Sequence, residues 1–85
     1  MAFILEIKPK ARKKLDTIPE NYRARVIQTL DAIVLNPFFG KKLSGKRDGQ
    51  YSVRVWPYRI IYMIQEDTKL IKIMEIKRRG HIFYD

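Results

Sequence analysis

The C-terminal half of the chain contains three consecutive segments with the composition of β-strands. They span residues 51–56, 58–64 and 70–76, and each is rich in β-branched and aromatic side chains. The dipeptide Trp56-Pro57 joins the first pair of segments, and a short polar turn, residues 65–69, separates the second pair. Because connections this short join neighbouring antiparallel strands, the sequence predicts an antiparallel sheet built from these three segments.

The N-terminal half has the pattern of one strand followed by two helices. Residues 3–7 form a short β-prone run, and residues 10–18 place apolar side chains at helical spacing. Thr17, Pro19 and Glu20 have the order of a helix start, with Thr17 as the expected capping residue. The residues expected to form the apolar stripes of the two helices are Ala11, Leu15, Ile18, Tyr22, Val26, Ile27, Leu30, Ile33 and Val34.

The order of these segments predicts an α+β fold in a single domain, residues 1–85. We expect an N-terminal strand, a helical hairpin and then an antiparallel sheet of three further strands, with both helices on one face of the sheet. The last strand is apolar on both faces apart from Lys72 and Glu75. This pattern predicts a strand that is buried on both sides at the centre of the sheet.

Arginines are set into the first two strands of the predicted sheet. If a two-residue connection joins these strands, Val55 faces Tyr58 and Arg54 faces Arg59. A longer loop is the alternative, because proline does not readily adopt the positive φ of the favoured two-residue turns. Like charges directly opposite each other cost a few tenths to about 1 kcal/mol, and a bound phosphate would reverse that sign. Otherwise each arginine pairs with a carboxylate such as Glu75.

Charge and composition narrow the functional classes. The formal net charge is +9, from 18 Lys and Arg against 9 Asp and Glu. This charge predicts salt-dependent attraction to polyanions, among which nucleic acid is the first candidate. The chain has no cysteine and one histidine, which excludes disulfides and a thiolate nucleophile and predicts no metal site and no cofactor. No apolar run approaches about 18 residues, and the N-terminus lacks the features of a signal peptide. We therefore expect a cytoplasmic protein without membrane association.

A basic loop, residues 38–49, precedes the predicted sheet. It contains several glycines, and its positive charge comes from Lys41, Lys42, Lys46 and Arg47. One interpretation is a solvated linker, and the other is a basic loop beside a nucleic-acid groove. A glycine-rich phosphate cradle is not supported, because the glycine spacing is absent and no helix follows.

The chain resembles the RelE/ParE toxin superfamily in the order of several short motifs. After the helical hairpin these are Lys42-Leu-Ser-Gly45, Tyr51-x-Val-Arg54, Tyr58-Arg-Ile-Ile-Tyr62 and a strand ending in Lys77-Arg-Arg-Gly-His81, with a tyrosine close behind. The resemblance covers nearly the whole chain and implies the RelE-like fold of microbial RNases. It also implies a toxin of a type II toxin–antitoxin system, with an acidic cognate antitoxin as its partner in a hetero-oligomer.

The resemblance leaves more than one activity open. RelE-like members cut mRNA in the ribosomal A site, whereas ParE-like members inhibit DNA gyrase. The RelE-like branch implies a ribosome-dependent mRNA endoribonuclease, with ribosome and mRNA as partners, in which a 2′-OH attacks the adjacent phosphate without a metal. From its charge alone, the chain could also be a basic nucleic-acid-binding module without catalysis.

Site residues follow from the resemblance and from the chemistry of RNA cleavage. Arginines suit the phosphate clamp, and an imidazole with an ordinary pKa of about 6.5 and a phenol suit the proton transfers, with acid and base unassigned. The expected catalytic residues are Arg54, Arg59, either Arg78 or Arg79, His81 and Tyr84. The expected substrate-binding residues are Lys41, Lys42, Lys46, Arg47, Trp56 and Phe83. Ser52 stands where some RelE-like members carry a basic residue. For the histidine and the aromatic residues, the alternative is local packing.

Overall fold

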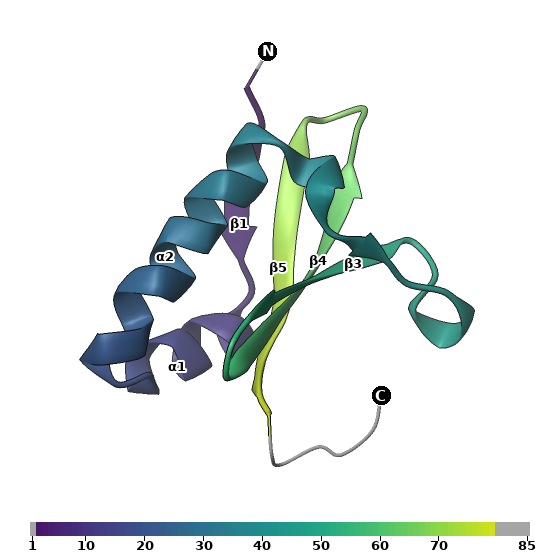
Figure 1. Ribbon diagram of the computed structural model, residues 1–85. Coiled ribbons are helices and arrows are strands. Elements are labelled where there is room, and N and C mark those ends of the chain that lie inside the picture. Colours follow the sequence, from purple (N-terminus) through teal and green to yellow (C-terminus); the bar gives the residue numbers. More distant parts are fainter. Residues whose placement is uncertain (1, 80–85) are drawn as a thin grey trace.

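The computed structural model describes residues 2–79, which form a five-stranded sheet with two helices on one side (Figure 1). Along the chain the elements are β1 (Ile4–Ile7), α1 (Pro9–Thr17), α2 (Glu20–Leu35), η1 (Pro37–Phe39), β2 (Lys41–Lys42), η2 (Gly45–Arg47), β3 (Gln50–Val55), β4 (Tyr58–Gln65) and β5 (Leu70–Arg78). The sheet order is β1-β5-β4-β3-β2, with β1 parallel to β5 and the other pairs antiparallel. The predicted α+β class is confirmed.

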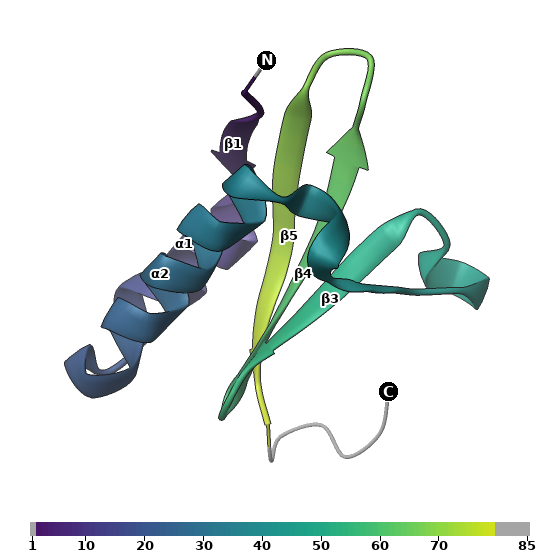
Figure 2. The same ribbon diagram turned by 45° about the horizontal axis from the view of Figure 1, so that its top comes forward.

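Both helices cover the same face of the sheet, as the two views in Figures 1 and 2 show. Their apolar stripes and the inward side chains of the strands form one buried core, which consists of Ala11, Leu15, Ile18, Val26, Leu30, Ile33, Val53, Val55, Tyr58, Ile60, Tyr62, Ile71, Ile73 and Ile76. Burying each large apolar side chain contributes roughly 1.5–3 kcal/mol. The opposite face, which no helix of the described chain covers, is called the open face below.

The β3–β4 hairpin has the register that a two-residue connection predicts. Arg54 pairs with Arg59, and Val55 pairs with Tyr58. The peptide bond between Trp56 and Pro57 in the connection is cis. The hairpin therefore turns Val55 and Tyr58 to the core and both arginines to the open face.

A β-bulge in β5 decides which of its side chains reach the open face. Ile61 and Tyr62 are consecutive in β4, but their partners in β5, Glu75 and Ile73, are two positions apart, so one residue of β5 is left without a partner in β4. The extra residue changes the phase of the alternation along β5. As a result, Ile73 and Ile76 are both buried in the core, and Glu75 turns to the open face.

The position of β5 differs from the prediction. β4 lies at the centre of the sheet, and β5 lies between β4 and β1. Only the helix-facing residues of β5, such as Ile71, Ile73 and Ile76, are buried; Lys72 and Glu75 are partly exposed. The prediction of burial on both sides was wrong because both helices cover the same face.

The expected cap of the second helix is also absent. Thr17 ends α1, and its hydroxyl donates to the carbonyl of Lys14, a local bond that competes with capping. Pro19 occupies the N-cap position of α2. The buried stripe of α2 is narrower than expected, since Ile27 is 42% exposed, because the helix meets the sheet mainly through Val26 and the residues one and two turns beyond it.

The segment expected to be a loop contributes an edge strand. Lys41 and Lys42 form β2, which pairs with Ser52 and Tyr51 of β3. Two 3₁₀ turns, η1 and η2, flank this strand. The pairing fixes the basic segment against the sheet, which its glycines and charges did not predict.

Tyr62 anchors the start of this segment to the core. Its hydroxyl, on a fully buried side chain, donates to the carbonyl of Pro37 at 2.7 Å. Burial raises the pKa of Tyr62 to about 12; a backbone hydrogen bond from Gly40 opposes this shift, and the nearby Tyr51 adds to it. A Cβ atom on Gly40 would lie 2.5 Å from the Tyr62 hydroxyl oxygen. The chain passes so close to β4 at Gly40 that the site has no room for a side chain.

In the described part of the chain, neither helix is long and apolar enough to cross a membrane.

Candidate functional site

The open face carries two rows of side chains that run across neighbouring strands. One row joins Arg54 of β3, Arg59 of β4 and Lys77 of β5. Like charges directly opposite each other on neighbouring strands cost a few tenths to about 1 kcal/mol per pair, and a nearby anion offsets this cost. The neighbouring row, from β2 to β5, consists of Lys41, Ser52, Ile61 and Glu75.

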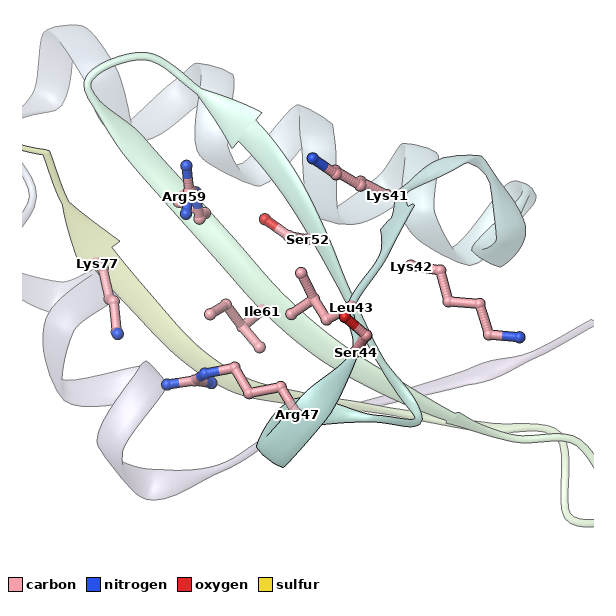
Figure 3. A pocket seen from close by; sticks show the side chains of 9 residues that line it. All are labelled: Lys41, Lys42, Leu43, Ser44, Arg47, Ser52, Arg59, Ile61 and Lys77. Carbon is pink, nitrogen blue, oxygen red and sulfur yellow. The ribbon is translucent and has the colours of Figure 1, made fainter. Parts of the chain in front are cut away.

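A cleft of about 360 Å³ lies between the open face and the η2 segment (Figure 3). Its size falls in the range of small-molecule sites, which begins at about 300 Å³. In Figure 3 the side chain of Lys42 extends away from Arg59, Arg47 and Lys77. The residues that line the cleft are Lys41, Lys42, Leu43, Ser44, Arg47, Ser52, Arg59, Ile61 and Lys77.

Ile61 forms the apolar floor of the cleft. Its side chain is only 3% exposed, yet it is not part of the core beneath the helices. Leu43, which is half-buried, lines the same cleft. Ile61 lies among the side chains that line the cleft, and neither α1 nor α2 covers this face. The cleft thus combines a dry floor with cationic walls, where charges interact more strongly than in open water.

Glu75 is a carboxylate that lies among these cations. Its side chain is 17% exposed and lies 3.1 Å from the Lys10 Nζ, 3.4 Å from the Arg47 Nη2 and 4.0 Å from the Lys77 Nζ. Burial raises the pKa of Glu75, but the hydrogen bond from Lys10 and the charges of Lys77, Lys10 and Arg47 together lower this pKa below its ordinary value. The carboxylate is therefore ionised at neutral pH.

The structure separates the arginines that the sequence grouped together. Arg54 is exposed and forms no ion pair with any carboxylate of the described chain, while Arg59 lines the cleft. Arg78 pairs with Tyr58, and its guanidinium lies 5.7 Å from the centre of the Tyr58 ring. Since Tyr58 faces the core, Arg78 lies on the helix side of the sheet. Arg79 is exposed in the turn that follows β5, and its backbone N–H donates to the carbonyl of Pro57.

The other predicted site residues also fall into those that line the cleft and those that do not. Of the basic segment, Lys41, Lys42 and Arg47 line the cleft, whereas Lys46 is exposed in η2. Trp56 is 61% exposed at the hairpin turn and does not line the cleft. Three predicted residues lie outside the described residues, namely His81, Phe83 and Tyr84.

Sequence reasoning assigned no site role to Lys77, and it considered Glu75 only as an ion-pair partner of the arginines. A signal for Lys77 was present, because it follows the buried Ile76 and alternation turns it outward. Glu75 precedes Ile76 and carries the same signal, but its spacing of two from the buried Ile73 predicts the opposite face. Without the bulge, Glu75 would share a face with Ile73. The residue types of an apolar strand do not show where a bulge will form.

Comparison with known proteins identifies the family. Residues 5–83 match the model of the ParE toxin of type II toxin–antitoxin systems, parDE. The chain belongs to the RelE/ParE toxin superfamily. The resemblance carried by the motifs is confirmed.

Individual RelE/ParE relatives match over nearly the whole chain. The RelE1 protein of Methanocaldococcus jannaschii is 29% identical over 83 residues, covering 93% of this chain and 92% of that protein. A chain of the archaeal RelE–RelB complex from Pyrococcus horikoshii OT3 is 30% identical, with a TM-score of 0.80 and coverage of 96% and 100%. A chain of the RelBE2 toxin–antitoxin complex from Mycobacterium tuberculosis is 23% identical, with a TM-score of 0.84 and coverage of 93% and 100%, which shows the shared fold.

In this RelE/ParE toxin the described residues of the open face suit anion binding and charge stabilisation. Guanidinium groups stay charged at any working pH and present forked donors that match phosphate oxygens. The chain's one histidine, His81, lies outside the described residues, as does Tyr84. Cleavage chemistry that needs proton transfer would therefore combine the described cations with residues that follow them in the chain.

Proposed function

We propose that this toxin is a ribosome-dependent mRNA endoribonuclease. The observation that carries the proposal is the cationic cleft of about 360 Å³, whose lining includes Arg59 and Lys77. Arg54, outside the lining, lies directly opposite Arg59 on the neighbouring strand. The strand register places Arg59 and Lys77 directly opposite each other, so both cations can contact one bound phosphodiester. A forked guanidinium beside an ammonium group suits the recognition of phosphate oxygens.

The proposed reaction is attack of the RNA 2′-OH on the adjacent phosphate. The bond between the 2′-oxygen and phosphorus forms, the bond from phosphorus to the 5′-oxygen breaks, and the products are a 2′,3′-cyclic phosphate and a 5′-OH. Arg59, Lys77 and Arg47 stabilise the negative charge that grows on the phosphate oxygens. His81 and Tyr84 carry the proton from the 2′-OH and to the leaving 5′-oxygen, with base and acid unassigned.

We also propose an acidic antitoxin as the partner that neutralises the toxin in a hetero-oligomer. Two observations support it: the formal net charge of +9, and the RelE–RelB complex formed by the Pyrococcus horikoshii relative. Complementary charge would make association fast and sensitive to salt. The proposed site of action, with ribosomes and mRNA, is the cytoplasm.

Inhibition of DNA gyrase is the second candidate function. It is favoured by one observation, since the family model that matches residues 5–83 is that of the ParE toxin. A gyrase inhibitor would bind a protein through the same surface and would need no proton carriers.

Replacing Arg59 tests the endoribonuclease proposal. Arg59→Ala is expected to lower the rate of mRNA cleavage on purified ribosomes by about 10-fold or more, the scale for loss of one charge-stabilising donor. Arg25→Ala is the matched control, because it removes the same charge from an exposed position on α2, on the other side of the sheet. Equal cleavage by both variants would refute a phosphate-contacting role for Arg59.

A double replacement in the tail separates the two candidate functions. His81→Ala with Tyr84→Phe keeps the cationic face, so ribosome binding should persist while cleavage falls by roughly 10²-fold or more. The readout is mapping of mRNA ends after induction in growing cells. Growth arrest that persists in the double variant, with intact mRNA and broken DNA, would transfer the assignment to gyrase inhibition.

A further inference from the structure

The side chain of Arg47 links the η2 segment to the sheet. The backbone bonds across residues 43–50 are local: Leu43 N–H donates to Gln50, Arg47 N–H to Ser44, and Asp48 N–H to Gly45. Within the described chain, the ion pair from this segment to β5 is that of Arg47 with Glu75, 28 residues away in sequence. Arg47 also donates to the side-chain oxygen of Gln50 on β3 at 3.4 Å, so this one side chain joins the segment to two strands of the sheet.

Glu75 connects three parts of the molecule at one point. Its Oε1 faces Arg47 of η2, and its Oε2 faces both Lys10 of α1 and Lys77 of its own strand. Two of these cations, Arg47 and Lys77, line the cleft together with Arg59. Without a carboxylate between them, the cations would repel one another and the mobile ends of their side chains would separate.

The carboxylate does not cancel the positive character of the site. Three cations surround it, namely Lys10, Arg47 and Lys77. A guanidinium has five N–H donors, so Arg47 keeps donors for a second partner while it contacts Glu75. Most of the Glu75 side chain is buried, which fixes its position. The pKa of Glu75 lies below its ordinary value, so its charge persists throughout the neutral range.

We propose that Glu75 is a positioning residue that holds Arg47 and Lys77 at the cleft, so that a phosphate of the substrate meets cations already in place. The inference rests on the proposed endoribonuclease function for its effect on catalysis. Its structural part, the attachment of residues 43–50 to β5, stands on the contacts alone. Hydrogen-bond donors that are already in place stabilise the transition state more than donors that must rearrange when the substrate binds.

Hydrogen–deuterium exchange tests the structural part without RNA. In Glu75→Gln, which keeps the size of the side chain but removes its charge, amides of residues 43–50 should exchange roughly 5- to 30-fold faster than in the wild type. Exchange in α2 should not change, because the core is untouched. The control is Glu66→Gln, which removes an exposed carboxylate from the turn after β4. Unchanged exchange in residues 43–50, or an equal rise in α2, would overturn the proposal.

Kinetics on ribosomes test the catalytic part. Glu75→Gln should lower kcat by about 10-fold or more with little change in KM, because the variant gains net positive charge for RNA attraction but loses the arrangement of its donors. Arg47→Gln should accelerate amide exchange in residues 43–50 to a similar extent. The variant with both substitutions should exchange little faster than either single variant, as expected of two partners in one contact. Faster loop exchange with unchanged kcat would refute the catalytic role. If the wild type cuts no mRNA, the endoribonuclease proposal fails, while the exchange result still decides whether Glu75 positions the segment.

Discussion

Replacing Tyr62 by phenylalanine removes one hydroxyl from the interior and tests how the basic segment is anchored. The hydroxyl donates to the carbonyl of Pro37 at 2.7 Å, on a side chain with no exposed surface. Removing the donor leaves a buried carbonyl unsatisfied, which costs about 1–3 kcal/mol. We therefore expect Tyr62→Phe to unfold at a lower urea concentration than the wild type at neutral pH.

The same hydroxyl predicts how this difference changes with pH. Because burial raises the pKa of Tyr62 from 10.0 to about 12, the unfolded chain loses this proton at a lower pH than the folded chain does. The stabilising contribution is therefore complete below about pH 9 and is lost as the pH rises from about 10 to 12. At pH 11 the unfolded phenol is about nine-tenths ionised and the folded phenol about one-tenth, which corresponds to a loss of about 1.4 kcal/mol.

The assay is urea unfolding of both proteins at about pH 8 and about pH 11, followed by the fluorescence of Trp56. Lysines also titrate in this range, but they are common to both proteins and cancel in the difference between them. The stability advantage of the wild type over Tyr62→Phe should shrink by about 1.4 kcal/mol between the two pH values. Tyr22→Phe, which removes the hydroxyl of a half-buried ring on α2, is the matched control. If the two proteins differ in free energy of unfolding by the same amount at both pH values, the raised pKa of a buried Tyr62 hydroxyl is refuted.

Further expectations concern the close approach at Gly40, the two faces of β5 and the charge of the partner. Gly40→Ala should lower the free energy of unfolding by about 1–3 kcal/mol in urea titrations, because its Cβ would meet the Tyr62 hydroxyl at 2.5 Å; stability equal to that of the wild type would contradict this crowding. Lys77→Ala should slow mRNA cleavage by about 10-fold or more, and Arg78→Ala should slow it less, because only Lys77 lies at the cleft; the reverse order in single-turnover assays would contradict the face assignment. Association with an acidic antitoxin should weaken steadily as salt increases, measured by calorimetry; affinity independent of salt would argue against charge complementarity.

Local patterns in the sequence were sufficient for the order of β1, the two α-helices and the last three strands, and for the face of each residue in the β3–β4 hairpin. Side chains alternate along a strand, and a two-residue connection permits one register, so the opposition of Arg54 and Arg59 follows from neighbouring residues alone. The buried stripe of α1 follows in the same way from helical spacing. The RelE/ParE family was also readable, because its motifs are short and continuous in sequence.

Only the tertiary structure decided what completes the cleft. The bulge in β5 turns Glu75 and Lys77 to the open face, and it arises from how two strands fit together while Ile73 and Ile76 are both buried. The contact between Arg47 and Glu75 joins residues that are 28 positions apart, so neither reveals its partner in a local pattern. The charged residues of the site can be identified from the sequence. Their arrangement depends on long-range packing, which the periodicity of a single strand or helix does not encode.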